Sequence, residues 1–186
     1  MLLSALVLSP FLQAKVPVDL PPDSSTYITV DRAVRKIGRA DLRSRRFAAG
    51  DVELRLWSGF SWGLVNGFIL TRRSGAWRAT LVRQDYRKPA RLAWTVQPIA
   101  PPARGWNAVW SELDALGLRT IPDEASLPDD GVGIDDGTKL LFEVRRGAAY
   151  RAFYYDNPEQ HTKRPTAQAA AKMARIVART LPGGYL

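Results

Sequence analysis

Two pairs of apolar, period-two segments, each joined by a short glycine-containing turn, constrain the fold of this chain most. The segments and turns are 64–72, Ser74-Gly75 and 77–84 in the first pair, and 139–145, Arg146-Gly147 and 149–155 in the second. A short turn that contains a residue able to adopt positive φ joins neighbouring antiparallel strands. The sequence therefore predicts two β-hairpins.

Further strands are predicted next to the first hairpin. Val52, Leu54 and Leu56 alternate with residues 53, 55 and 57, which is typical of a strand with one buried face. Residues 92–96 form another candidate strand, which the proline-containing stretch 98–102 is expected to end.

Helical spacing appears before, between and after these strands. Residues 30–37 have a narrow apolar face and a basic opposite face, so we expect this helix to pack on the sheet with its basic side in solvent. Trp106 and Trp110 lie on the apolar face of a second helix that Gly117 ends, and a third begins near Pro165. The prediction is an α+β fold: an antiparallel sheet of about five to six strands in two hairpin-containing groups, packed by two or three helices.

The N-terminal region predicts export. Residues 1–14 contain an apolar run and a small-residue boundary, typical of a signal peptide, although no Lys or Arg precedes the run. Residues 15–28 are expected to form an extended linker, and residues 29–186 a single α+β domain. No segment reaches the roughly 20 apolar residues of a spanning helix, so the mature chain is expected to lack one. The expected location is periplasmic or secreted, and cytoplasmic if the leader prediction fails.

The net charge of +9 is unevenly distributed. Residues 105–143 are acidic, whereas residues 31–104 and 144–186 are basic and rich in arginine. Arginine suits phosphate and carboxylate partners. Pairing of the acidic third with the basic remainder explains the same pattern, and we favour that interpretation because net charge does not define specificity.

Few residues offer catalytic chemistry. The chain has no cysteine, and its one histidine, His161, has no triad motif around it, so we expect a solvated loop residue. The acidic loop contains Asp129, Asp130, Asp135 and Asp136 and is followed by Glu143. Its register places apolar residues where an EF-hand needs oxygen ligands, which excludes an EF-hand. A divalent-cation site of another kind is the alternative, but Asp-Gly turns close a surface loop without a metal, so we expect no metal site and no cofactor.

An exposed aromatic contact is the better candidate for a site. Phe60 and Trp62 lie in a glycine-flanked loop, and Arg151 and Tyr155 lie on one face of the last predicted strand. We take these four residues as the candidate ligand-binding set, because exposed aromatic side chains suit sugars, peptides or bases.

The expected function is binding rather than catalysis. We predict an exported, soluble bacterial protein of the cell envelope, whose partner is another protein or an envelope component. The first alternative is a hydrolase that uses the acidic loop 129–143, which requires Asp136, Glu143 or His161 to gather in one cleft. The second is a basic cytosolic protein that contacts nucleic acid, a less favoured interpretation because no nucleic-acid-binding motif is present.

Overall fold

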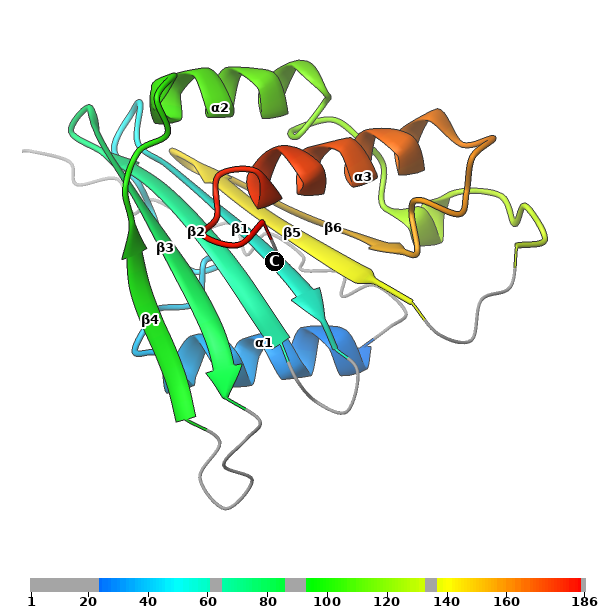
Figure 1. Cartoon of the computed structure of the whole chain (residues 1–186), viewed down its shortest axis with the longest axis horizontal. Helices are drawn as coiled ribbons and strands as arrows, with labels where there is room; N and C mark the ends of the chain where they lie inside the picture. The colour runs from blue at the N-terminus through cyan, green and yellow to red at the C-terminus, as the bar shows by residue number, and fades with distance from the viewer. Residues whose placement is uncertain (1–23, 61–64, 86–92, 133–136, 185–186) are drawn as a thin grey trace, which may run out of the picture.

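Six antiparallel strands form one sheet in the computed structural model of the chain, in the order β4-β3-β2-β1-β5-β6 (Figure 1). The structure describes residues 24–60, 65–85, 93–132 and 137–184. The strands are β1 (Val52–Gly59), β2 (Val65–Arg73), β3 (Ala76–Asp85), β4 (Ala93–Ile99), β5 (Lys139–Arg146) and β6 (Ala149–Asp156). The predicted α+β class, with its antiparallel sheet, is confirmed.

Both predicted hairpins are present, as the β2–β3 and β5–β6 pairs. Ser74 and Gly75 both have positive φ, of 50° and 81°, which matches the right-handed twist of the strands they join. β4 is longer than predicted and continues through Pro98 to Ile99. Proline is tolerated there because β4 lies at the edge of the sheet, where a missing N–H donor need not break a ladder.

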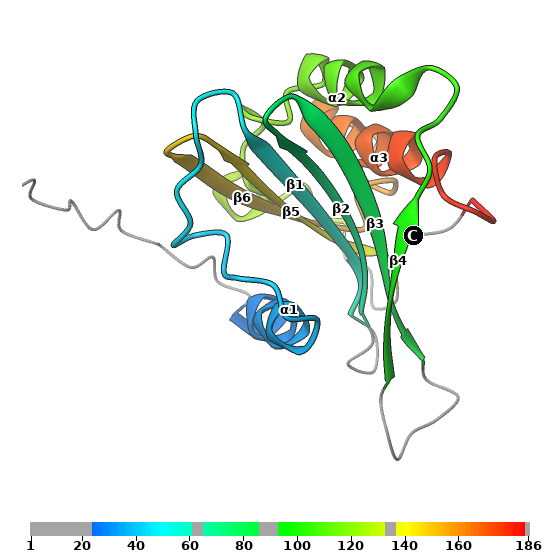
Figure 2. The same cartoon turned by 90° about the vertical axis from the view of Figure 1, so that its left-hand side faces the viewer.

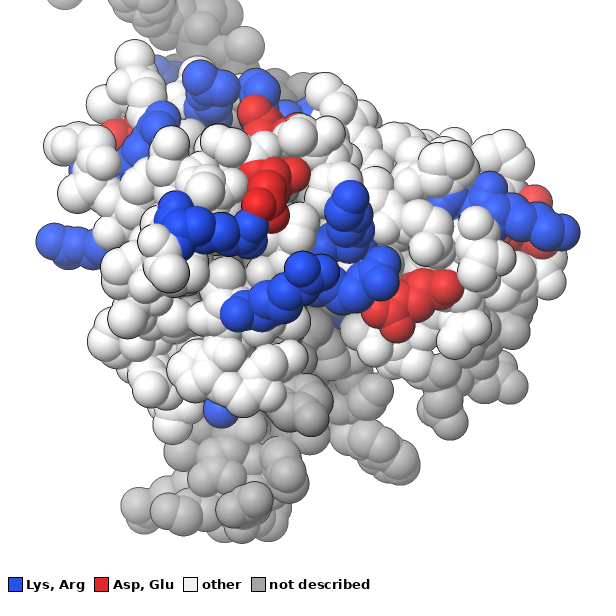
Figure 3. All heavy atoms as spheres, turned by 45° about the horizontal axis from the view of Figure 1, so that its top comes forward, with Lys and Arg blue, Asp and Glu red and all other residues white. Residues whose placement is uncertain are grey.

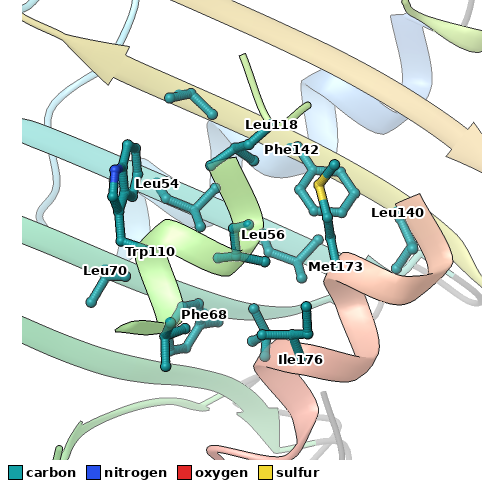
Figure 4. Packing of buried hydrophobic residues seen from close by; sticks show 14 of the residues in the cluster. Leu54, Leu56, Phe68, Leu70, Trp110, Leu118, Leu140, Phe142, Met173 and Ile176 are labelled. Carbon is teal, nitrogen blue, oxygen red and sulfur yellow. The ribbon is translucent and has the colours of Figure 1, made fainter. Parts of the chain in front are cut away.

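Helices cover both faces of the sheet (Figure 2). α2 (Gly105–Ala115) and α3 (Pro165–Ala178) pack on one face, and α1 (Ser24–Lys36) packs on the other. The larger core lies under α2 and α3 and includes Leu54, Phe68, Phe142 and Met173 (Figure 4). Both tryptophans of α2 belong to this core, as their helical spacing predicts.

The α1 face has a smaller apolar cluster around Trp57. Its buried members are Tyr27, Val30, Ala33, Val34, Trp57, Val65, Ile69, Val82 and Leu141. Trp57 is paired in register with Gly67, where an added Cβ would lie 2.4 Å from the indole ring. A glycine on β2 therefore makes room for the tryptophan on β1.

Two predictions about this face are wrong. β1 is buried on both faces, and Glu53, Arg55 and Trp57 are each at most 1% exposed. α1 begins at Ser24, so residues 24–28 are helical rather than part of an extended linker. The earlier part of that linker and the predicted signal peptide lie outside the described residues. Within the described part of the chain, no helix combines the length and apolarity that a bilayer span requires.

Candidate functional site

The structure does not gather the four predicted ligand-binding residues. Phe60 is partly buried and packs against the α1-face cluster, and Trp62 lies outside the described residues. Tyr155 is fully buried in the opposite core, where its hydroxyl donates a 2.8 Å hydrogen bond to the carbonyl of Pro122. Arg151 lines a pocket of about 400 Å³ with Arg119, Arg146 and Tyr150. Tyr155 is therefore a core residue, and no common surface joins it to Phe60.

His161 is not a solvated loop residue, contrary to the prediction. It is 7% exposed, and its Nδ1 lies 2.7 Å from a carboxylate oxygen of Asp130. Its Nε2 lies 3.6 Å from Glu124, in the short 3₁₀ helix η3 (Glu124–Ser126). Arg164, just before α3, forms an ion pair with Asp130 at 2.9 Å. The four side chains tie the start of α3 to the acidic loop.

The carboxyl groups of this cluster are already engaged within the fold. Glu124 accepts a 2.6 Å hydrogen bond from the backbone N–H of Asp156, and burial raises the pKa of Glu124. Desolvation opposes ionisation of Asp130, but its hydrogen bond with His161 holds the pKa of Asp130 below its usual value. Asp129 accepts from the backbone N–H of Gly131, which closes a turn. Among the described residues, no group of three or more His, Cys, Asp or Glu side chains is placed to hold a metal ion.

Glu143 lies on the other side of the sheet, under the α1 face. Its carboxylate accepts hydrogen bonds from Trp57 Nε1 at 2.9 Å and from the Tyr150 hydroxyl at 3.1 Å. Burial raises the pKa of Glu143, and these two hydrogen bonds oppose the rise. His161 is beside α3, which covers the opposite face, so the two groups do not share a cleft. Asp135 and Asp136 lie outside the described residues.

A recess lined by arginines is the strongest candidate site. It measures about 320 Å³ and is lined by Arg39, Arg45, Glu53, Thr71, Arg73, Ala76, Arg78 and Thr80. We call it the arginine pocket. One wall comes from the connection between α1 and β1, and the floor comes from β1, β2 and β3 on the side that faces α1.

Glu53, the one carboxylate among the described residues that line the arginine pocket, is neutralised from two sides. Glu53 is 1% exposed, and its two oxygens each lie 2.8 Å from a guanidinium nitrogen, one of Arg55 and one of Arg73. Within the described part of the chain, Arg39, Arg45 and Arg78 form no ion pair. The pocket therefore has uncompensated positive charge.

The wall of the arginine pocket is held in place by contacts outside the pocket. Arg43 forms ion pairs with Asp31 of α1 at 2.7 Å and with Asp41 at 2.9 Å, and these contacts raise the pKa of Arg43. The buried Arg55 donates a 2.8 Å hydrogen bond to the carbonyl of Ala40. The side chain of Leu42 is fully buried. The backbone of residues 40–44, between Arg39 and Arg45, is therefore held in place by these contacts.

An aromatic side chain adds to this rigidity. The Arg73 guanidinium lies 3.5 Å from the ring centroid of Phe47, and that of Arg45 lies 5.8 Å from the same centroid. Such cation–π contacts restrict the guanidinium groups without neutralising them.

The opposite side of the molecule has a different charge pattern. Figure 3 shows acidic side chains next to several of the basic ones on the face that it presents. Near α2, Arg104 pairs with Glu112 and Arg119 pairs with Asp114. The Arg104–Glu112 pair joins the acidic third to the basic remainder, as predicted, whereas Arg119 and Asp114 both lie within the acidic third. Positive charge in the arginine pocket is not balanced in this way.

No family model, curated protein or solved structure matches this chain. The geometry of the described residues is therefore the basis for a functional proposal.

Sequence reasoning missed the arginine pocket, although a signal was present. Polar residues occupy alternate positions on three successive strands, at Glu53, at Thr71 with Arg73, and at Arg78 with Thr80. Their register places Glu53 opposite Thr71 and Thr71 opposite Arg78, in one row across the sheet. Reading these positions together, rather than as separate solvent-facing residues, would have located the floor of the pocket.

Proposed function

We propose that this protein is a non-catalytic binding protein that holds an anionic ligand in the arginine pocket. The observation that carries the proposal is that three guanidinium groups, of Arg39, Arg45 and Arg78, line one recess without an acidic partner among the described residues. Guanidinium groups bind carboxylates and phosphates through paired, charge-assisted hydrogen bonds. Like charges close together repel one another, and a bound anion removes that repulsion.

Two further observations support binding over hydrolysis. Glu143 is enclosed between Trp57 and Tyr150, and His161 is held by Asp130 on the other side of the sheet. The hydrolase alternative needed these groups in one cleft. Because each is part of a separate internal network, we favour a ligand that is held rather than transformed.

We further propose that binding takes place in the cell envelope, after export directed by residues 1–14. Anionic envelope components are the partners that an arginine-lined recess suits. The intact mass of tagged protein from fractionated cells tests this part. A chain that begins at Lys15 in the periplasmic or secreted fraction supports it, and a full-length chain in the cytosol contradicts it.

Calorimetric titration with inorganic phosphate and with citrate, at low salt, tests anion binding itself. We compare the wild type with the double variant Arg45→Ala/Arg78→Ala, whose side chains are exposed and form no ion pair with a described residue. Arg83→Ala is the matched control, since Arg83 is also exposed and on β3 but five residues from Arg78, and therefore on the other face. We expect binding by the wild type and by Arg83→Ala, with a loss of at least tenfold in the double variant. Absence of binding by the wild type, or equal binding by all three proteins, refutes the proposal.

A further inference from the structure

We infer that the ligand of the arginine pocket is a phosphate monoester on a compact polar body, such as a sugar phosphate. This inference rests on the proposed anion-binding function and names the ligand class. Charge, size and hydrogen-bonding groups each favour it.

The charge of the arginine pocket matches a doubly charged group better than a singly charged one. Arg39, Arg45 and Arg78 have no acidic partner within the described residues, and Glu53 is occupied by Arg55 and Arg73. A phosphate monoester brings a charge of about −1.5 to −2 at neutral pH and three acceptor oxygens. A carboxylate brings a charge of −1 and two oxygens. Three guanidinium groups line the same recess, and a phosphate group offers them three acceptor oxygens.

The size of the arginine pocket admits more than a bare ion. Its volume of about 320 Å³ lies at the lower end of the range of small-molecule pockets, which starts at about 300 Å³. A bound phosphate group alone would leave much of this space to water. A body about the size of one sugar ring fills it better.

The remaining lining residues offer hydrogen bonds to such a body. Thr71 and Thr80 line the floor from adjacent strands, at β2 and β3. The Thr71 hydroxyl donates to the carbonyl of Arg78 at 3.3 Å, which leaves its oxygen able to accept from a ligand hydroxyl. Ala76, with its small side chain, leaves space next to them. These groups suit hydroxyls rather than an apolar chain.

The pocket is also preorganised for a small anion. Arg43 and Arg55 fix the backbone between Arg39 and Arg45, and Phe47 restrains Arg73. A fixed backbone at Arg39 and Arg45 reduces the conformational entropy lost on binding, so a small ligand can be held by few contacts.

Calorimetric titration with four probes tests the inference: glucose 6-phosphate, inorganic phosphate, glucuronate and glucose, at pH 7.5 and low salt. We expect glucose 6-phosphate to bind at least tenfold more tightly than the other three. The double variant Arg45→Ala/Arg78→Ala should bind glucose 6-phosphate at least tenfold more weakly than wild type, since each charge-assisted hydrogen bond contributes substantially. Arg83→Ala should match the wild type.

Titration at pH 5.0 adds an independent readout. The second ionisation of a phosphate monoester has a pKa of about 6, so the ligand loses charge at pH 5.0 and should bind several-fold more weakly. Glucuronate keeps its charge at both values. Equal binding of glucuronate and glucose 6-phosphate overturns the monoester inference but leaves anion binding intact. Absence of binding by every anion overturns both.

Vesicle co-sedimentation separates the two sources of a phosphate monoester. Vesicles with phosphatidic acid display a monoester, whereas vesicles with phosphatidylglycerol display a diester. Binding to glucose 6-phosphate without sedimentation on either vesicle supports a soluble ligand. Sedimentation on phosphatidic acid alone, lost in the double variant, assigns the monoester to a lipid headgroup. Equal sedimentation on both vesicles overturns recognition of a monoester.

Discussion

Gly67 is the position at which one added methyl group should damage the α1 face most. In Gly67→Ala, the new Cβ would lie 2.4 Å and 2.5 Å from two carbon atoms of the Trp57 indole, well inside the normal carbon contact of about 3.5–4.0 Å. Trp57 has little freedom to move, because it is fully buried and its Nε1 donates to Glu143. Overpacking of this kind costs about 1–3 kcal/mol, and the lower chain entropy of alanine offsets about 0.5–1 kcal/mol.

We therefore expect Gly67→Ala to lower the free energy of unfolding by about 1–2 kcal/mol, measured by urea unfolding with an unchanged slope. The control is the same substitution in a Trp57→Phe background, which lacks the indole ring carbons that the new Cβ would meet. The cost of Gly67→Ala should fall there to about 0.5 kcal/mol or less, giving a coupling energy near 1 kcal/mol. An equal cost in both backgrounds refutes the clash as its cause.

Three further substitutions, with one control at an exposed ion pair, test the internal polar network. Glu53→Ala should lower the free energy of unfolding by about 3–5 kcal/mol, because it leaves the guanidinium of Arg55 buried without compensation. The control Glu112→Ala, at an exposed ion pair, should change the free energy of unfolding by at most about 0.5 kcal/mol. Equal effects of the two substitutions in urea unfolding would contradict the prediction. Burial raises the pKa of Glu143 in the folded protein, so its protonated form contributes stability that is fully present below the ordinary glutamate pKa. This contribution should be lost as the pH rises through the raised pKa of the folded state. Glu143→Gln should abolish that part of the pH dependence, and an unchanged stability–pH curve would exclude the raised pKa. Tyr155→Phe should cost about 1 kcal/mol in thermal unfolding through loss of its bond to a backbone carbonyl, and no change would show that this bond contributes nothing.

Local patterns in the sequence were sufficient to predict most elements of the fold. Ser74-Gly75 located the first hairpin turn, Arg146-Gly147 came within one residue of the second turn, at Gly147-Ala148, and Pro165 located the start of α3. These signals concern only a few neighbouring residues, and each follows from backbone conformation. The antiparallel sheet could be predicted for the same reason.

Burial of the α1-facing side of the sheet could not be predicted from the sequence of β1 alone. Charged residues at alternate positions of a strand usually face solvent, so Glu53 and Arg55 were assigned to an exposed face. α1 covers part of that face, and the α1–β1 connection covers another part. Such burial depends on contacts between segments that are distant in sequence.

The candidate site was missed for a related reason. Sequence reasoning treats Phe60 and Tyr155 one at a time, as exposed aromatic residues, and the structure places them in different apolar clusters. The arginine pocket instead combines residues of one connection and three strands. Arg39 and Arg78 come together only through the docking of α1 and the register of the sheet.

The central place of β1 has a consequence for how the chain is made. β1 pairs with β2 on one side and with β5 on the other, and Trp57 bonds to a residue 86 positions later in the chain. During synthesis, β1 therefore remains an edge strand until the last quarter of the chain emerges, with one row of backbone N–H and C=O groups unpaired. Open edges recruit other strands. A nascent or truncated chain that stops before Lys139 should depend on chaperones to stay monomeric, whereas the full-length chain closes that edge by itself.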